Sequence, residues 1–282
     1  MATERDELTG AETTGHEWDG LKELNNPLPR WWLYILYASI VASVIYSFFV
    51  PPIPGVMGVF ETTRAVVRQD IELARDAQSA NLERIRLASL QEIRDDASLR
   101  DFVYSGGSSV FAENCAPCHG PGGAGVPGYP ALVDDVWLWG GTLGDIHDTI
   151  AYGVRSDDPD TRWSEMIAFG RDDVLNHSEI EDVSHYVLSL SDTDNDREAA
   201  LRGEVIYAEN CATCHGDAGE GDDLLGAPAL NDHLWLYGGT LDEVISQVDN
   251  PKHGVMPAWH ERLDDTTIKM LSVYVHTLGG GQ

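Results

Sequence analysis

All four cysteines of the chain lie in two copies of one pentapeptide, Cys-x-x-Cys-His. Two thiols three positions apart can each form a thioether to one edge of a porphyrin, and the histidine beside them can then bind the iron. The residues in question are Cys115, Cys118 and His119 in the first copy and Cys211, Cys214 and His215 in the second. The motif therefore predicts two covalently attached haem c groups, each with a histidine as one axial iron ligand.

Other uses of paired cysteines fit this chain less well. A thioredoxin-type Cys-x-x-Cys needs no histidine after it and usually occurs once. A structural zinc site would bring two cysteine pairs about 15–20 residues apart, whereas the pairs here begin 211 − 115 = 96 residues apart. Disulfides would leave both histidines without a role. Haem attachment accounts for the cysteines and the histidines together.

A second axial ligand would make each haem a six-coordinate electron carrier, and methionine is the usual partner of histidine. Of the five methionines, Met1 is the first residue, Met57 lies beside an apolar segment and Met270 lies in the predicted last helix. The other two are Met166, which follows His119 by 166 − 119 = 47 residues, and Met256, which follows His215 by 256 − 215 = 41 residues. We predict Met166 and Met256 as the second ligands. Because such iron has no open position for a substrate, we assign no catalytic residue.

Other ligand arrangements stay open at this point. Histidine in place of methionine would lower the reduction potential, and the candidates are His147, His177, His185 and His253. Each methionine could also serve the haem of the other half of the sequence. Arg155 and Arg162 precede Met166, and either could pair with a haem propionate.

The two haem motifs lie in similar halves of the chain. A glycine and an aromatic residue precede each motif with the same spacing: Gly107 and Phe111 in the first half, Gly203 and Tyr207 in the second. We therefore predict a mainly α fold with two tandem class I cytochrome c domains, at residues 105–193 and 194–282. In each domain the glycine would let the first helix cross closely over the last, which carries Tyr186 or Tyr274.

A single apolar segment precedes these domains. Residues 31–50 form a run of 20 residues without a charge, close to the ~20 needed to cross a bilayer as a helix. Pro51, Pro52 and Pro54 would end it, and we predict a transmembrane helix at residues 31–52. A cleaved signal peptide is less favoured, because its apolar core is usually about 7–15 residues and its leader is basic.

The charges beside the apolar segment predict an orientation. Lys22 and Arg30 come just before it, and the next basic residue after it is Arg64. The positive-inside bias therefore places residues 1–30 in the cytoplasm. The haem domains would then face the periplasm, from a single-pass anchor in a bacterial inner (cytoplasmic) membrane. Between anchor and haem domains, residues 53–104 are predicted as a helical connector, because residues 62–101 contain no glycine or proline; we expect one break in it.

The charge of the chain limits its partners. The formal net charge is −29, and residues 105–282 carry 8 basic and 31 acidic side chains, a net of −23. Such a balance excludes nucleic acid, whose phosphates need lysine and arginine. It favours a basic protein as the partner of the haem domains.

Two segments resemble a known family. The segment at residues 16–32, which ends in Asn25-Asn26-Pro27-Leu28-Pro29-Arg30-Trp31-Trp32, resembles the N-terminal signature of the dihaem subunit of cbb3-type cytochrome c oxidases (subunit III, the P subunit). The segment at residues 134–142 resembles the same family. The order of anchor, connector and two haem motifs agrees with it over essentially the whole chain.

The resemblance implies a role in respiration. Such a subunit accepts electrons from soluble or membrane-bound cytochrome c and passes them through a monohaem subunit to the catalytic haem–copper subunit, which reduces oxygen and pumps protons. The family's axial ligands fall on His119, Met166, His215 and Met256. The family commonly has Met-Pro at both distal sites; Met256-Pro257 agrees, whereas Met166 is followed by Ile167.

Two other functions remain to be weighed against this one. A stand-alone membrane-anchored dihaem shuttle for another reductase or dehydrogenase would have the same motifs. A dihaem peroxidase or haem sensor would need a haem with a displaceable ligand, which the two well-placed methionines oppose.

Overall fold

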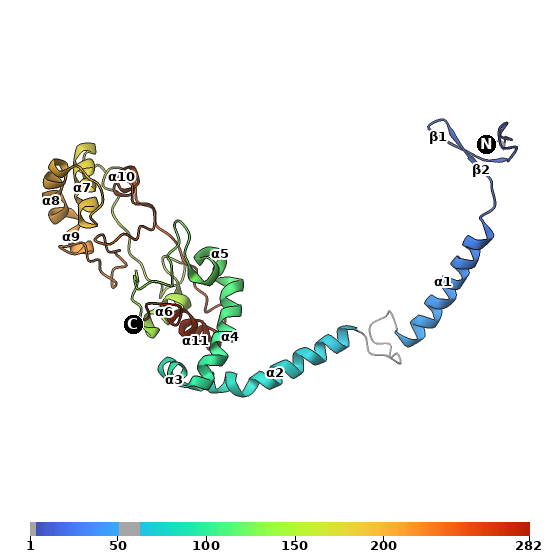
Figure 1. Cartoon of the computed structure of the whole chain (residues 1–282), viewed down its shortest axis with the longest axis horizontal. Helices are drawn as coiled ribbons and strands as arrows, with labels where there is room; N and C mark the ends of the chain where they lie inside the picture. Colours follow the sequence, from blue (N-terminus) through green and yellow to red (C-terminus); the bar gives the residue numbers. More distant parts are fainter. Residues whose placement is uncertain (1–3, 51–62) are drawn as a thin grey trace. The chain divides into compact units, whose positions relative to one another are not determined.

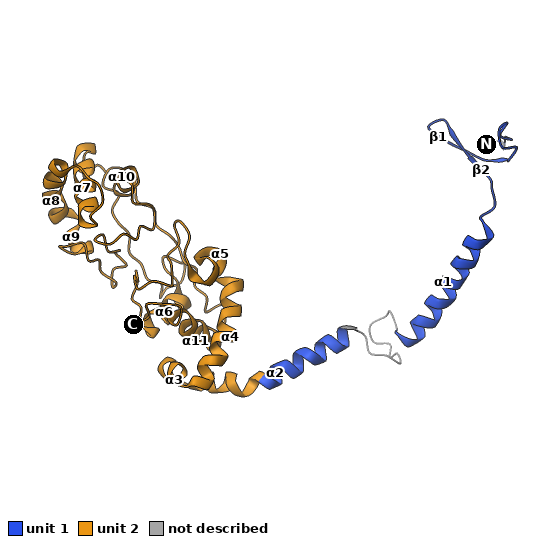
Figure 2. Cartoon of the chain, viewed as in Figure 1, with its two compact units in different colours: residues 1–77 blue, residues 78–282 orange. Residues whose placement is uncertain are grey.

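The computed structural model describes residues 4–50 and 63–282. The chain divides into two compact units, residues 1–77 and 78–282 (Figure 2). Helices make up most of the regular structure of both units (Figure 1), so the prediction of a mainly α protein is confirmed. The residues predicted to end the apolar helix, Pro51, Pro52 and Pro54, lie outside the described residues, as does Met57.

The first unit begins with a hairpin that the sequence analysis did not predict. Strand β1 (Thr13–Trp18) pairs antiparallel with β2 (Leu21–Leu24). Asp19 and Gly20 form the turn between them, with φ angles of 46° and 85°. Two positive φ values in a two-residue Asp-Gly turn are typical of the type I′ hairpin.

The apolar segment forms helix α1 (Arg30–Phe49), which has 20 residues, a mean hydropathy of 1.8 and no buried side chain. Large side chains such as Tyr34 and Phe48 are 69% and 76% exposed. Exposing an apolar surface of this size to water is unfavourable by about 25 cal/mol for each Å². Of the described helices, α1 alone is long and apolar enough to cross a membrane, and it fits a membrane anchor.

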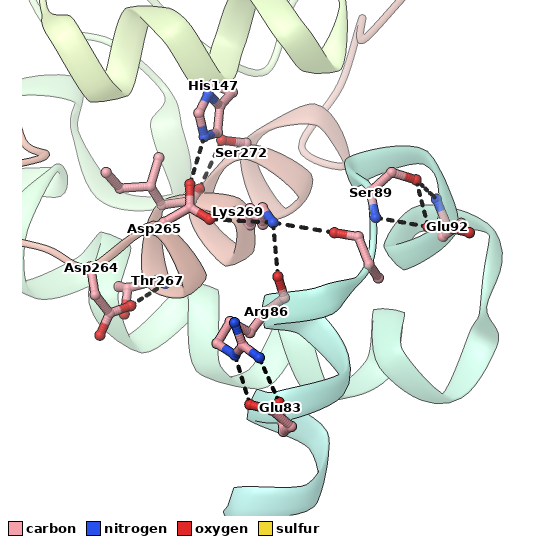
Figure 3. Close-up of polar contacts among 12 residues, drawn as sticks. Glu83, Arg86, Ser89, Glu92, His147, Asp264, Asp265, Thr267, Lys269 and Ser272 are labelled. Atoms are coloured by element: carbon pink, nitrogen blue, oxygen red, sulfur yellow. Dashed lines mark hydrogen bonds and ion pairs between the residues drawn. The ribbon is translucent and has the colours of Figure 1, made fainter.

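The connector is helical with two breaks, one more than expected. Helix α2 (Thr63–Leu87) is followed by α3 (Leu90–Asp95) and α4 (Ala97–Asn114). The first break is a capping box, in which the Ser89 side chain accepts a bond from the Glu92 N–H and the Glu92 carboxylate accepts from Ser89 (Figure 3). At the second break Asp96 caps α4. Both residues satisfy amide donors that a helix start leaves free.

The remaining helices belong to the haem-motif region of the second unit. They are α5 (Ala116–His119), the 3-10 turn η1 (Pro121–Gly123), α6 (Leu143–Tyr152), α7 (His177–Leu190), α8 (Arg197–Asn210), α9 (Ala212–His215), α10 (Leu241–Asp249) and α11 (Asp265–His276).

These helices form two cores that do not follow sequence order. Helix α4 precedes the first haem motif and packs on α11, the last helix of the chain, and α6 also packs on α11. Helix α8 precedes the second haem motif and packs on α7, which also contacts α10. The last helix of each half thus completes the core of the other half. The packing therefore crosses the predicted division at residues 193 and 194.

The glycine crossings show the same exchange. Gly107 of α4 lies against α11, where a Cβ on the glycine would stand 2.7 Å from the Tyr274 Cβ. Gly203 of α8 lies against the backbone of α7 at Asp182 and Val183. The predicted close crossing is present in both places, but each first helix crosses the last helix of the other half. An aromatic pair accompanies each crossing: the ring centroids of Phe111 and Tyr274 lie 5.5 Å apart, and those of Tyr186 and Tyr207 lie 5.1 Å apart.

The connector is packed on the first of these cores alone. A cluster of buried side chains joins it to α11 and the start of α6: Ile85, Ile93, Leu99, Val103, Leu143, Met270 and Val273. At its edge the Lys269 ammonium donates to the carbonyl oxygens of Arg86 and Ala88, at 3.2 and 3.3 Å (Figure 3). Residues 78–104 therefore form part of the haem-motif region.

We name the two packed bodies by their residues. Module 1 consists of residues 97–152 and 254–282, and module 2 consists of residues 164–250. The crossover segments, 153–163 and 251–253, connect them. Module 1 contains the Cys115 motif and module 2 contains the Cys211 motif.

Candidate haem sites

The two haem motifs have the same backbone conformation. In module 1 the N–H groups of Cys118 and His119 donate to the Cys115 carbonyl at 3.1 and 2.9 Å. In module 2 the matching bonds to the Cys211 carbonyl measure 3.1 and 3.0 Å. One helical turn therefore holds each cysteine pair and its histidine at fixed spacing. The first cysteine of each pair is half-buried or buried, and the second is exposed.

Both histidines are oriented by the same kind of hydrogen bond. The His119 Nδ1–H donates to the Pro130 carbonyl at 3.0 Å, and the His215 Nδ1–H donates to the Pro228 carbonyl at 2.9 Å. This bond selects the tautomer in which Nε2 carries the free lone pair, the usual arrangement of an iron-binding histidine. Burial lowers the pKa of His215, which favours its neutral form. The residues present therefore fit a haem on each motif.

Burial raises the pKa of the first cysteine of each motif, Cys115 and Cys211, to about 11. Neither of these two thiols is therefore activated as a thiolate, the reactive form in a redox pair.

The two methionines are exchanged between the halves of the sequence. Met256 packs against the core of module 1, which contains Phe111 and Leu271 and against which Cys115 also packs. Met166 packs against the core of module 2, which contains Cys211 and Phe169. Each methionine is half-buried. Each core thus combines the first cysteine of one haem motif with the methionine from the other half of the sequence.

The backbone holds the two methionine loops in different ways. Met256 exchanges two hydrogen bonds with Val154, both of 3.0 Å, as in an antiparallel bridge. Met166 donates its N–H to Nε2 of His253 at 3.0 Å. A pocket of about 300 Å³ opens beside Met166 and is lined in part by His253 and Ile167.

The competing histidines have other partners. His253 accepts the Met166 N–H, and His185 accepts the Asp196 N–H through Nδ1 at 3.1 Å. His147 lies beside Asp148 and Asp265 (Figure 3). His177 is the first residue of α7 and is exposed.

The two arginines are also engaged by the protein itself. Arg162 donates to the Trp139 carbonyl and to Asp145 Oδ1, the latter at 3.0 Å. Arg155 donates to the carbonyls of Ser164 and Gly254. The sequence analysis named both arginines as candidates for a propionate and missed these contacts. No local sequence motif predicts these contacts, because most of the acceptors are backbone oxygens of other segments.

Three family descriptions match successive parts of the chain. The N-terminal domain of cytochrome oxidase-cbb3, FixP, matches residues 10–56. Cytochrome c matches residues 104–191, and cytochrome c oxidase, cbb3-type, subunit III matches residues 198–275. The cytochrome c matches indicate haem c binding and agree with the motif geometry.

Relatives of similar length extend over the whole chain. The cbb3-type cytochrome c oxidase subunit CcoP of Azospirillum sp. (strain B510) is 48% identical, over 99% of this chain and 98% of its own. Subunit FixP of Sinorhizobium medicae (strain WSM419) is 47% identical, over 98% of this chain and 97% of its own. Subunit FixP of Bradyrhizobium diazoefficiens is 46% identical over 99% of both chains.

Proposed function

The chain belongs to the family of cbb3-type cytochrome c oxidase subunit III, and on that premise we propose that it takes up electrons through two haem sites with exchanged methionines. It is a membrane-anchored, electron-entry subunit of the oxidase. In the proposal one haem c is held by Cys115, Cys118, His119 and Met256. The other is held by Cys211, Cys214, His215 and Met166.

The packing of the two methionines is the observation that carries the proposed ligand pairs. Met256 belongs to the core that contains Cys115, and Met166 belongs to the core that contains Cys211. Pairing each methionine with the histidine that precedes it in sequence would require both loops to leave these cores. The exchanged pairs keep every helix and loop where it packs.

The protein contributes ligand geometry and a controlled environment. Haem c, when bound, supplies a one-electron couple whose potential depends on axial ligand, hydrogen bonding and burial. The carbonyls of Pro130 and Pro228 accept the Nδ1–H of His119 and of His215, which leaves Nε2 of each ring available for iron. A methionine as the second iron ligand would raise the potential relative to a second histidine. With both ligand positions filled by the protein, the haems would serve electron transfer.

The anchor and the charges support a specific placement. We place α1 across a bacterial inner membrane, with the N-terminal hairpin in the cytoplasm and both modules in the periplasm. Lys22 and Arg30 on the N-terminal side support this orientation. The lipid bilayer and the catalytic and monohaem subunits are then the partners of the N-terminal part.

The electron donor is proposed from the distribution of charge. Module 2 carries 3 basic and 20 acidic side chains, a net of −17, whereas module 1 carries 3 basic and 9 acidic, a net of −6. A basic cytochrome c, soluble or membrane-bound, would be steered toward module 2. The haem of the His215 site is then the first acceptor.

Purification of the tagged full-length chain in mild detergent tests the role in the complex. We expect the chain to co-elute with haem b and copper, and to carry two covalent haems that bind no carbon monoxide when reduced. A chain that purifies alone in quantity would support the stand-alone shuttle. Carbon monoxide binding to its c haems would support a peroxidase or sensor.

A further inference from the structure

The crossover between the modules is built around three residues, 153–155. Val154 is 6% exposed and exchanges two backbone hydrogen bonds with Met256. On the other side the Arg155 N–H donates to the Arg162 carbonyl at 2.9 Å, and the Arg162 N–H donates to the Gly153 carbonyl at 3.4 Å. The segment therefore lies between the chain that leads to Met166 and the chain that contains Met256.

The Arg155 side chain bonds to both methionine loops. Its Nε–H donates to the Gly254 carbonyl at 2.7 Å, and one Nη1–H donates to the Ser164 carbonyl at 2.9 Å. Gly254 lies two residues before Met256 and belongs to module 1. Ser164 lies two residues before Met166 and belongs to module 2. One guanidinium thus fixes the same relative position of both ligand loops.

The backbone of Arg155 is strained in a way that serves this contact. Its φ angle is +51°, in the left-handed region that is unfavourable for a non-glycine residue and persists only where the surroundings enforce it. The conformation directs the half-buried side chain to the two carbonyls. A planar group with fixed, divergent donors can hold two acceptors at once, which a single ammonium does less well.

A second contact joins the same loops but acts on one of them. His253, from the segment before Met256, accepts the N–H of Met166 itself. Its side chain makes no comparable bond to the Met256 loop among the described contacts. It offers an internal comparison, since its loss would loosen Met166 and spare the contacts of Met256 with Val154.

We propose that Arg155 is a positioning residue for both haem sites, holding the Met166 and Met256 loops together so that one substitution alters iron ligation at both. This inference rests on the ligand pairs of the proposed function. Arg155 acts through backbone carbonyls and is not itself an iron ligand.

The test compares variants of the haem-loaded, full-length chain in detergent by redox titration and by the red absorption band of a methionine–ferric haem bond. In Arg155→Ala we expect both one-electron waves to move to lower potential, by about tenfold in each equilibrium, or ~59 mV. The methionine band should weaken at both haems. In His253→Ala one wave alone should move.

Arg202→Ala is the matched control, because Arg202 is an exposed guanidinium that bonds Asp182 far from either methionine in sequence. It should leave both waves and the band unchanged. A shift of one wave or of neither in Arg155→Ala, or an equal shift in Arg202→Ala, would overturn the proposal. If Arg155→Ala does not take up haem, Arg155→Lys is measured in its place. A smaller shift of both waves supports the proposal that Arg155 holds both loops, and a shift of one wave or of neither contradicts it.

A separate pair of variants tests whether the two methionines are iron ligands. Met166→His and Met256→His, with Arg155 intact, should each remove half of the methionine band. If either substitution leaves the band unchanged, the proposed ligation fails whatever Arg155 does.

Discussion

Modules 1 and 2 hold the same haem motif in the same helical turn, yet they differ in almost everything around it. The turn bonds agree within 0.1 Å, from 2.9 to 3.0 Å at the histidine N–H, and both histidines donate to a proline carbonyl. Module 1 is covered by the connector cluster and has a net charge of −6. Module 2 has a net charge of −17. The comparison teaches that attachment is local, whereas potential and partner choice come from the surroundings.

The second methionine ligand shows the same contrast. Met256 is held by two backbone bonds to Val154 and followed by Pro257. Met166 is held by one bond to a histidine side chain and followed by Ile167. In the proposed ligation, module 1 would therefore have the more rigid methionine. Module 2 would have the more adaptable one, beside the pocket lined by His253 and Ile167.

Removal of each cysteine pair has the largest expected effect. Cys115→Ala with Cys118→Ala, or Cys211→Ala with Cys214→Ala, should halve the covalent haem per chain, because no thiol remains to form a thioether. Haem staining of a denaturing gel and a haem assay measure this. Full haem content in either double variant would refute the attachment sites.

Replacing exposed acidic residues with lysine tests which module the basic cytochrome c binds. Asp217→Lys with Asp223→Lys changes two exposed acidic residues of module 2, and Glu113→Lys with Asp135→Lys makes the same charge change on module 1. We expect electron uptake from a basic cytochrome c to slow by about tenfold in the first pair, since steering of this kind changes association rates by roughly 10–1,000-fold.

Stopped-flow reduction of the complex at low ionic strength measures these rates. The module 1 pair should change the rate much less, and added salt should remove the difference as the Debye length falls below ~10 Å. Equal slowing in the two pairs would reject module 2 as the docking surface.

The glycine crossings differ in what they contact. An added Cβ at Gly203 would stand 2.1 Å from the Asp182 carbonyl oxygen of α7, whereas one at Gly107 would stand 2.7 Å from the Tyr274 Cβ and 3.1 Å from the Met270 carbonyl oxygen, so Gly203→Ala makes the tighter contact. We expect Gly203→Ala to lower the free energy of unfolding by about 1–3 kcal/mol, as overpacking does, and Gly107→Ala by less. Urea unfolding of the haem-loaded chain measures both.

Gly144→Ala is the control for these variants, because it lies exposed in α6 with its nearest neighbour 3.8 Å from an added Cβ. It should be neutral or stabilising by about 0.5–1 kcal/mol. Equal losses for all three substitutions would show that close crossing is not what the two glycines provide.

Removal of the Tyr207 hydroxyl has the smallest expected effect. In module 2 the Tyr207 hydroxyl donates to the Gly216 carbonyl at 2.8 Å, and the matching residue in module 1 is Phe111. Tyr207→Phe should destabilise module 2 by about 1 kcal/mol, the usual net value of such a bond. Thermal melting followed through the two haem bands should show the His215 haem affected and the His119 haem unchanged.

Local features were predictable from the sequence, and long-range pairing was not. The Cys115–His119 turn follows from its own five residues, and α1 follows from its composition. Gly107 was correctly expected at a helix crossing, but its partner was predicted to be the last helix of its own half, and the structure places it against α11; both last helices present an aromatic residue, so the sequence does not distinguish them. The Asp19-Gly20 hairpin signal was present and was not used.

The exchange of the last helices and of the methionines between the two halves cannot be read from the spacing of residues in the sequence. Met166 and Met256 stand at similar distances, 47 and 41 residues, after the haem-motif histidines that precede them, so sequence order suggests the simple pairing. Which loop enters which core depends on the packing of α7 and α11. The contacts of Arg155 likewise join backbone atoms 9 and 99 residues away, beyond the reach of any local pattern.

The exchanged ligand pairs are tested most directly in a chain that keeps one haem. Cys211→Ala with Cys214→Ala leaves the His119 haem, and Met256→His or Met166→His is then added to that background. The account predicts that Met256→His removes the methionine band and lowers the potential of the remaining haem, because a second histidine replaces the thioether. Met166→His should leave both unchanged. Loss of the band in the Met166→His chain, with the Met256→His chain unaffected, would contradict the exchange.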